Sequence, residues 1–362
     1  MEEPLRQAWP RPSSPRPIVV IGAGSIVRDA HLPVYRRLGL PVAGIFDVRR
    51  DAAAELAAKF GSGRVFPSLE AAAAEHNVVF DVAVPPAAIR EVLPLLPEGA
   101  GVLIQKPLGV DYADAQQIEA ICREGRLVAA SNFQLRFSPN MLALHDAVGR
   151  GLLGQVTDVE VSVVLHTPWE YWAFLKGAPR LEILMHSIHY IDFVRYLLGD
   201  PLGVHCRGLN HPLMAGYADT RTTAIFDYPG IRCSLVANHA HRFSRRFQRS
   251  QIKVEGTEGA AIATMGVNLD YPRGEPDELW LAPIGGDWQQ VPLRGSWFLD
   301  AFEGPMSNLQ RVLAGEDAQL VSPVADALRT MAVVEACYTS SAAPMTAIPG
   351  DAQPYSYKKE PS

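Results

Sequence analysis

An apolar run that leads directly into two closely spaced glycines constrains the fold of this chain more than any other feature. Pro17-Ile18-Val19-Val20-Ile21 is short and continuous, which is typical of a strand buried on both faces of a parallel sheet. Gly22 then allows a tight turn, and Gly24 lets the backbone approach a pyrophosphate. The helix predicted to follow, beginning Ser25-Ile26-Val27, presents free N–H groups to the phosphates. Because Val27 replaces the third glycine of this fingerprint, the turn alone is weak evidence for a nucleotide site.

The next predicted strand supports a dinucleotide site. Residues 42–46 are apolar and end at Asp47, 23 residues after Gly24. A carboxylate at this place accepts hydrogen bonds from the ribose hydroxyls of adenosine and repels a 2′-phosphate, which favours NAD over NADP. Arg49 and Arg50 follow closely and could receive that phosphate, so NADP stays possible.

Short apolar runs and helical patterns continue to alternate, with strands predicted at 78–84, 102–105 and 127–133. This alternation predicts an α/β fold with a doubly wound parallel sheet, in which ligands lie beyond the carboxyl ends of the strands. The residues expected to contact the cofactor are therefore Gly22, Gly24, Ser25, Ile26, Asp47, Arg49, Pro85, Gln105 and Asn132.

Lys106 stands at one of these strand ends, between the apolar run 102–105 and Pro107. A lysine beside a nicotinamide ring could hydrogen-bond a substrate oxygen, and desolvation could lower its pKa. The alternative is a lysine whose charged end reaches solvent at the edge of the sheet.

The pattern changes after Phe137, which predicts a second domain. A helix at 139–150 is followed by many strands and few helices, which suggests an open, largely antiparallel sheet with one face available for subunit contact. The predicted organisation is a disordered, proline-rich arm at 1–16, a nucleotide-binding domain at 17–137, a substrate-binding and oligomerisation domain at 138–350, and a tail at 351–362.

The principal helix of this second half is predicted over residues 181–198. Glu182, His186 and His189 are spaced four and three residues apart, so they share one face. Two histidines and an acid on a mostly apolar helix suggest a site for proton transfer and substrate binding. The alternative is a solvated helix face.

Two further interpretations of this polar face are possible. A metal site made of Glu182, His186 and His189 is geometrically possible, but no other residue stands at a suitable spacing for a fourth ligand, so no metal is expected. Asp192 and Arg195 continue the stripe and are typical of an ordinary ion pair on a solvated face.

An aromatic segment precedes the helix and is predicted to be a loop. Its rings could pack on the apolar face of a sugar, while Lys176 supplies hydrogen bonds. The alternative is a small hydrophobic cluster. The predicted substrate-binding residues are Trp169, Tyr171, Trp172, Lys176 and Glu182.

Composition excludes several partners. The net charge of −6 and a pI near 5.9 argue against nucleic acid, and the arginine-rich run at 242–249 is short. Four widely spaced cysteines without CxxC spacing predict reduced thiols in the cytoplasm. No signal peptide and no apolar run of membrane-spanning length is recognised, so no membrane partner is expected.

Several motifs in a fixed order resemble the Gfo/Idh/MocA oxidoreductase family, which includes glucose–fructose oxidoreductase and inositol dehydrogenase. The resemblance spans about residues 17–345. The residues that carry it are Gly22-Ala23-Gly24, His31-Leu32-Pro33, Lys106-Pro107, Asn132-Phe133-Gln134-Leu135-Arg136-Phe137, His189-Tyr190-Ile191-Asp192 with Leu198-Gly199, and Gly256-Thr257-Glu258-Gly259.

The resemblance implies a Rossmann domain followed by a domain with an open sheet, in homodimers or homotetramers. It implies a nicotinamide cofactor and a sugar, cyclitol or related polyol as substrate. It makes Lys106 the catalytic lysine and His189 the acid/base. Two departures concern the mechanism: Gln105 stands where the family has glutamate, and Met185 stands where it has aspartate, so His186 or Glu182 could substitute in the relay.

Three functions remain open at this point. The first is hydride transfer between NAD(P) and a substrate hydroxyl or carbonyl. The second is redox-assisted elimination or hydrolysis of a glycoside, in which transient oxidation acidifies a neighbouring C–H. The third is a non-catalytic dinucleotide-binding protein, against which the presence of Lys106 and His189 argues.

Overall fold

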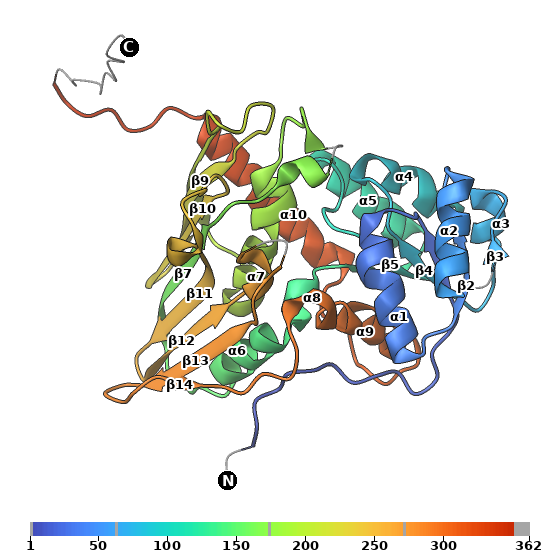
Figure 1. The fold of residues 1–362 in the computed structure, drawn as a ribbon, viewed down its shortest axis with the longest axis horizontal. Helices are drawn as coiled ribbons and strands as arrows, with labels where there is room; N and C mark the ends of the chain where they lie inside the picture. The colour runs from blue at the N-terminus through green and yellow to red at the C-terminus, as the bar shows by residue number, and fades with distance from the viewer. Residues whose placement is uncertain (1–2, 62–63, 173–174, 271–272, 351–362) are drawn as a thin grey trace.

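A computed structural model describes residues 3–61, 64–172, 175–270 and 273–350. Two sheets form the framework, with helices packed between them and around the first sheet (Figure 1). In the described part of the chain, no helix is both long and apolar enough to cross a membrane.

The first sheet has six parallel strands in the order β3-β2-β1-β4-β5-β6, which confirms the predicted doubly wound fold. Each predicted apolar run supplies a strand of this sheet. The strands are β1 (Ile18–Ile21), β2 (Val42–Phe46), β3 (Arg64–Val65), β4 (Val79–Val82), β5 (Gly101–Ile104) and β6 (Val128–Ser131).

Side chains of the central strand β1 divide between two hydrophobic cores, one on each face of the sheet. Val19 and Ile21 pack with α3, α4 and α5, whereas Ile18 and Val20 pack with α1, α2 and α9. Because both faces are covered, the strand needs a continuous apolar run rather than an alternating one. The helices are α1 (Leu32–Leu38), α2 (Arg50–Phe60), α3 (Leu69–Ala73), α4 (Ile89–Val92), α5 (Tyr112–Glu124) and α9 (Glu303–Leu313).

Helix α9 returns from the far end of the sequence to cover the first sheet, where it lies beside α1 (Figure 1). Met306 and Leu309 of α9 are fully buried in the core of that face. Gly101 of β5 permits the close approach, because a Cβ atom there would lie 2.4 Å from Leu313. A helix from beyond the predicted domain boundary at residue 137 therefore contributes to the core of the first sheet.

The second sheet has eight strands in the order β14-β13-β12-β11-β7-β10-β9-β8. Its pairs are antiparallel except β7 with β10, which confirms the predicted open sheet, although β13 and β14 were not predicted. The strands are β7 (Val156–Val164), β8 (Gly203–Leu209), β9 (Arg221–Tyr228), β10 (Ile231–Asn238), β11 (Arg249–Gly256), β12 (Gly259–Thr264), β13 (Glu278–Pro283) and β14 (Gln289–Gln290).

Burial alternates along these strands, so only one face of the second sheet is covered. The inner face packs on helices that lie between the two sheets in Figure 1, and the outer face carries exposed Ile225 and Val236. The helices of this half are α6 (Pro139–Gly149), α7 (Ile188–Leu198), α8 (Trp297–Asp300) and α10 (Val324–Ala342).

Residues 3–16 were predicted to be disordered, and for the described residues this prediction is wrong. The segment has no regular secondary structure but is held by side chains from distant parts of the chain. The Trp9 indole N–H donates to Asp317 at 2.8 Å, and its ring meets Phe137 edge-on with centroids 5.2 Å apart. The backbone N–H of Arg6 donates to Asp146 at 2.9 Å. The predicted tail at 351–362 lies outside the described residues.

The helix predicted at 181–198 consists of two parts. Glu182–Ser187 forms a wider π-helical turn, and α7 continues from Ile188 to Leu198. The α-helical spacing used in the prediction therefore fails across the first turn.

Candidate active site

The carboxyl edge of the first sheet gathers the predicted cofactor-binding residues. Gly22 follows β1, Asp47 follows β2, Pro85 follows β4, Gln105 follows β5 and Asn132 follows β6. Because all these strands are parallel, their ends meet at one edge, where doubly wound sheets bind their ligands.

The glycine turn has the geometry expected of a phosphate cradle. Gly22 has φ +109°, and a Cβ atom there would lie 2.3 Å from the carbonyl oxygen of Ala83. Gly24 has no protein atom within 4 Å of its would-be Cβ, so the space beside it is open to a ligand. Helix begins at Ser25, which is exposed, and its first N–H groups are available to phosphate oxygens. These features fit a bound dinucleotide.

A pair of alanine substitutions separates the two glycines. Gly22→Ala is expected to lower the stability by at least about 2 kcal/mol, because the new methyl group collides with the backbone at a positive φ. Gly24→Ala is expected to leave Tm unchanged but to weaken NADH binding about tenfold or more, since the methyl group fills the cradle. Thermal melts and NADH fluorescence titration check this, and wild-type affinity in Gly24→Ala would contradict the placement of the phosphates.

Asp47 ties the end of β2 to the glycine turn. One carboxylate oxygen accepts the backbone N–H of Ala23 at 2.7 Å, and the other accepts that of Arg49 at 2.8 Å. Each oxygen keeps a lone pair for a ribose hydroxyl. The Arg49 side chain is exposed, and its Nε lies 3.7 Å from Asp47, so a 2′-phosphate would have to compete with this carboxylate.

The two predicted catalytic segments meet. Lys106 Nζ donates to the backbone carbonyl of Met185 at 2.9 Å, which places the end of β5 against the helix that carries His189. Gln105 turns back, and its carboxamide oxygen accepts the N–H of Lys106 at 3.0 Å. His189 is buried, its Nδ1 has no hydrogen-bond partner, and its ring contacts Trp297 edge-on with centroids 5.5 Å apart.

Burial lowers the pKa of both groups. Desolvation lowers the pKa of Lys106 to about 8. Desolvation, followed by the charge of Lys106 and then that of His186, lowers the pKa of His189 well below its usual value. A neutral imidazole therefore stands beside an ammonium group.

A buried network that the sequence interpretation missed fixes Asn132. The Asn132 amide is 3.2 Å from His31 Nε2, and His31 Nδ1 is 2.8 Å from Asp81, which also accepts the Tyr35 hydroxyl at 2.8 Å. The amide donates to Nε2, so the proton of His31 is on Nδ1. The signal was present in the sequence, since Asp81 is a lone charge within the apolar strand 78–84.

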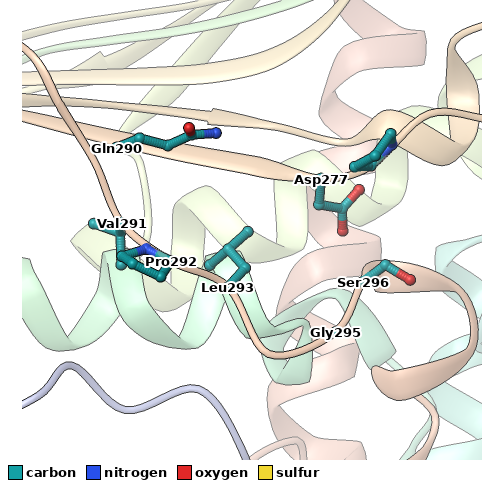
Figure 2. Close-up of a pocket in the computed structure, with 8 residues that line it drawn as sticks. Asp277, Gln290, Val291, Pro292, Leu293, Gly295 and Ser296 are labelled. Atoms are coloured by element: carbon teal, nitrogen blue, oxygen red, sulfur yellow. The ribbon is translucent and has the colours of Figure 1, made fainter.

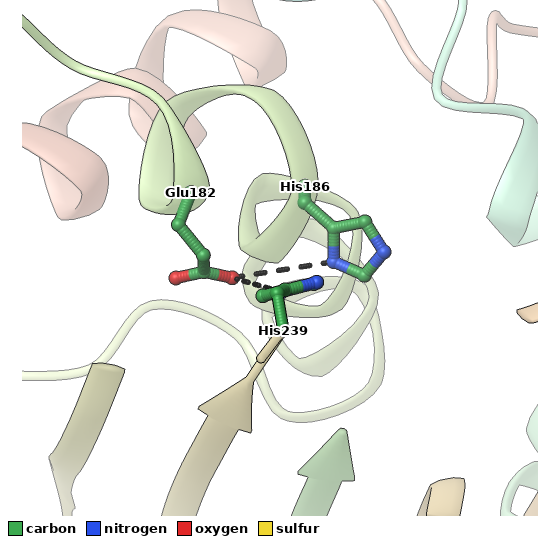
Figure 3. Close-up of side chains that lie close together, drawn as sticks. All are labelled: Glu182, His186 and His239. Atoms are coloured by element: carbon green, nitrogen blue, oxygen red, sulfur yellow. Dashed lines mark hydrogen bonds and ion pairs between the residues drawn. The ribbon is translucent and has the colours of Figure 1, made fainter. Parts of the chain in front are cut away.

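A second cluster lies beside the contact of Lys106 with Met185 and consists of Glu182, His186 and His239 (Figure 3). The prediction placed His189 with Glu182 and His186, and this is wrong. The π-helical turn carries Glu182 and His186 toward β10, where His239 follows the last strand residue, whereas His189 faces Trp297. His239 was missed because spacing along one helix cannot reveal a partner from a strand.

The aromatic loop divides into buried and exposed parts. Trp169 is buried in a small core with Leu175 and Met214, which supports the alternative of a hydrophobic cluster for this residue. Its ring lies 5.2 Å from that of His239, so it also walls the second cluster. Tyr171 and Lys176 are exposed, Trp172 is partly buried, and their contacts with substrate remain predictions.

A cavity of about 360 Å³ opens between β14 and α8 (Figure 2). Asp277 and Ser296 line it, and burial raises the pKa of Asp277 to about 6 although its carboxylate accepts the N–H groups of Gly266 and Trp297. Lys106 and His189 do not line this cavity, so it is not assigned to the substrate.

Asp192 and Arg195 do not form the predicted solvated ion pair. Both are buried. Asp192 accepts two hydrogen bonds from Arg136, at 2.6 and 2.7 Å, and Arg195 pairs with Asp200 and Asp326. The polar stripe of α7 is thus an internal contact with the segment that follows β6 and with α10.

Comparison with known proteins agrees with this architecture. An oxidoreductase family with an NAD-binding Rossmann fold matches residues 16–133, and the Gfo/Idh/MocA C-terminal domain matches residues 141–262. D-apiose dehydrogenase of Paraburkholderia graminis is 23% identical over 335 residues, which are 89% of this chain and 86% of the relative. 1,5-Anhydro-D-fructose reductase of Ensifer adhaerens is 24% identical over 250 residues, 67% of this chain and 74% of the relative.

Two solved structures share the fold. An oxidoreductase from Agrobacterium radiobacter, in complex with NAD+, L-tartaric acid and magnesium, has a TM-score of 0.77 at 18% identity and covers 91% of this chain and 97% of its own. Levoglucosan dehydrogenase, in complex with NADH and levoglucosan, has a TM-score of 0.75 at 17% identity and covers 91% of this chain and 98% of its own. Since both domains match in order and the glycine turn and strand ends fit a dinucleotide, this chain belongs to the Gfo/Idh/MocA family of NAD-binding oxidoreductases.

Proposed function

We propose that this enzyme transfers a hydride between NAD and a CH–OH carbon of a sugar, cyclitol or related polyol. One observation carries the proposal: Lys106, at the cofactor edge of the first sheet, bonds to Met185 on the helical segment that leads to His189. The acid/base pair thus lies where the two domains meet, with the cofactor residues on one side and the aromatic loop on the other.

His189 is assigned the proton transfer. Its ring is neutral near pH 7, and its unpartnered Nδ1 is buried, so it is suited to accept the hydroxyl proton of a substrate. NAD, when bound, supplies the hydride acceptor. Lys106 is assigned the stabilisation of negative charge on the substrate oxygen, because its ammonium group donates hydrogen bonds in a desolvated setting.

The family aspartate is absent beside this pair, since Met185 occupies its position. Glu182 faces His239 and Ser187 rather than His189. We therefore assign no carboxylate relay to His189, and the proton accepted by its ring is expected to pass to solvent.

The relatives support a sugar-like substrate. Enzymes acting on apiose, anhydrofructose and levoglucosan share the fold or part of the sequence. The exposed ring of Tyr171, which lies against that of Trp172, is the kind of surface that packs on the apolar face of a sugar.

Asp47 supports a preference for NAD over NADP. Its carboxylate is held at the end of β2 by two backbone N–H groups, where it would meet the adenosine ribose and repel a 2′-phosphate.

Two other features support the proposed compartment and assembly. All four cysteines are buried free thiols, which supports the cytoplasm. The outer face of the second sheet carries Ile225, 55% exposed, and Val236, 40% exposed, which supports a homodimer or homotetramer that covers this face.

The test is a substrate panel with NAD+ and NADP+ at 340 nm, over sugars, cyclitols and glycosides. NADH formation with one polyol, and about tenfold or greater preference for NAD+, is the expected result. Release of aglycone from a glycoside without net NADH would replace the proposal by redox-assisted elimination. Binding of NADH with no turnover on the whole panel would indicate a dinucleotide-binding protein without catalysis.

A further inference from the structure

Three potential metal ligands converge beside the proposed active site, and nothing assigned so far uses them together. Glu182 and His186 come from the π-helical turn and His239 from the end of β10, and Figure 3 shows the three side chains pointing toward one another. One ligand atom from each residue lies within 4.8 Å of the other two.

The separations suit one small cation. His239 Nε2 lies 3.2 Å from a Glu182 carboxylate oxygen, and His186 Nδ1 lies 4.0 Å from the same oxygen. Tetrahedral zinc with bonds of about 2.0–2.1 Å holds its ligand atoms about 3.3 Å apart. A side-chain movement of about 0.7 Å would bring His186 Nδ1 to this separation from the Glu182 oxygen.

The charges of the cluster also favour a cation. Glu182 is fully buried, and its second carboxylate oxygen has no hydrogen-bond partner. His186 Nδ1 is likewise buried and without one. Among the described residues, the basic side chains within ion-pair distance of Glu182 are His186 and His239. A buried carboxylate with so little compensation is costly unless a cation joins it.

The ligands are held from behind. His239 Nδ1 lies 2.7 Å from the hydroxyl of Thr167, which fixes the ring. When Nδ1–H donates to the hydroxyl oxygen, Nε2 is unprotonated and free to bind a metal. The Ser187 hydroxyl donates to Glu182, and the ring of Trp169 packs against His239. Orienting groups behind the ligands are usual in metal sites.

We propose that Glu182, His186 and His239 bind a zinc ion. Two imidazoles and one carboxylate form a ligand set that zinc uses in enzymes, in which the fourth position stays open to water or substrate. Met185, between Glu182 and His186 in sequence, accepts the hydrogen bond from Lys106, so the ion lies next to the proposed reaction centre. On the proposed function, on which this step rests, the zinc ion binds a second substrate oxygen and orients the sugar for His189 and Lys106.

The competing explanation is an ion pair in which protonated His239 neutralises Glu182 without any metal. It leaves His186 Nδ1 unpartnered, whereas in the zinc site this atom is a ligand. Zinc binding separates the two explanations directly.

The test measures zinc on the full-length protein. The protein is dialysed against a chelator and then against metal-free buffer, loaded with zinc sulfate, desalted and analysed by mass spectrometry for metal content. We expect about one zinc per chain and a Tm raised by about 5 °C or more on loading. Glu182→Gln and His239→Gln are expected to retain less than about 0.2 zinc per chain, whereas His241→Gln, a histidine two positions away, keeps about one.

Thr167→Val guards against misfolding of the ligand variants. It removes the hydroxyl behind His239 and leaves all three ligands, so zinc affinity is expected to fall about 10–100-fold while the apoprotein keeps its Tm. No zinc on the wild type, equal zinc on His239→Gln, or preferential binding of Mn²⁺ over zinc in competition would each overturn the proposal.

The outcome is independent of the proposed reaction. If the protein binds zinc but turns over no compound of the substrate panel, the proposed substrate class is rejected and the metal site is retained. Turnover by a protein that binds no zinc would reject the metal site and leave the reaction. His189→Gln is expected to lose turnover but to retain zinc, because His189 lies outside the cluster.

Discussion

Lys106→Ala is expected to lower kcat by about 10³-fold while the affinity for NADH changes less than about threefold. The ammonium group is buried at the end of β5 and bonds to Met185, on the segment that carries the proposed acid/base. Its removal takes away the donor assigned to the substrate oxygen but leaves the glycine turn and Asp47 untouched. Steady-state kinetics with the best substrate of the panel and NADH fluorescence titration provide the two readouts.

Lys176→Ala is the matched control, since Lys176 is an exposed lysine of the predicted substrate loop. It is expected to alter KM rather than kcat, by less than about tenfold. Lys106→Arg tests whether charge suffices, and it should recover little activity because the larger guanidinium does not fit the same buried place. A kcat for Lys106→Ala within threefold of wild type would remove Lys106 from the mechanism.

The position of Lys106 at the cofactor edge could be predicted because parallel strands send all their carboxyl ends to one edge. A short apolar run therefore predicts a strand and also predicts that the residue after it lies at the ligand-binding edge of the sheet. Asp47, Pro85, Gln105 and Asn132 were located in this way, and each follows a strand of the first sheet.

The third member of the second cluster could not be predicted from spacing. His239 lies 53 residues beyond His186 and reaches it through the pairing of β10 with β7 and β9. The π-helical turn adds a second obstacle, because it changes which residues share a face. The α-helical spacing therefore grouped His189 with Glu182, although in the folded protein it is His239 that lies beside Glu182.

Long-range packing also escaped the prediction. The arm at residues 3–16 has the composition of a disordered segment, yet Trp9 finds Asp317 and Phe137 from distant parts of the sequence. Similarly, α9 has the pattern of any amphipathic helix, and nothing local indicates that it covers the first sheet. Composition and period describe what a segment can bury, not where the partner lies.

Asp192→Ala on α7 is expected to destabilise the protein through the loss of a buried ion pair. Asp192 is fully buried and accepts two hydrogen bonds from Arg136, which is itself 2% exposed, and a third from Thr330 at 2.8 Å. Removing one partner of a buried ion pair leaves the other charge poorly compensated, which costs about 3–5 kcal/mol. Asp326 and the carbonyl of Val321 still contact Arg136, so we expect a loss of stability at the lower end of this range, about 3 kcal/mol. In a chain of 362 residues, whose unfolding entropy is about 0.76 kcal/mol/K, Tm should fall by about 4 °C.

Asp200→Ala is the control from the same network. Asp200 pairs with Arg195 and Arg329 but is 41% exposed, so water replaces it and the loss should stay below about 1 kcal/mol. Equal loss of Tm in both variants would contradict the assignment of the stability to the buried pair. The comparison also bears on function, because Asp192 lies three residues after His189 on α7 and Arg136 four residues after Asn132. Their ion pair therefore fixes the proposed acid/base relative to the cofactor edge, and Asp192→Ala should lose activity at temperatures below its Tm.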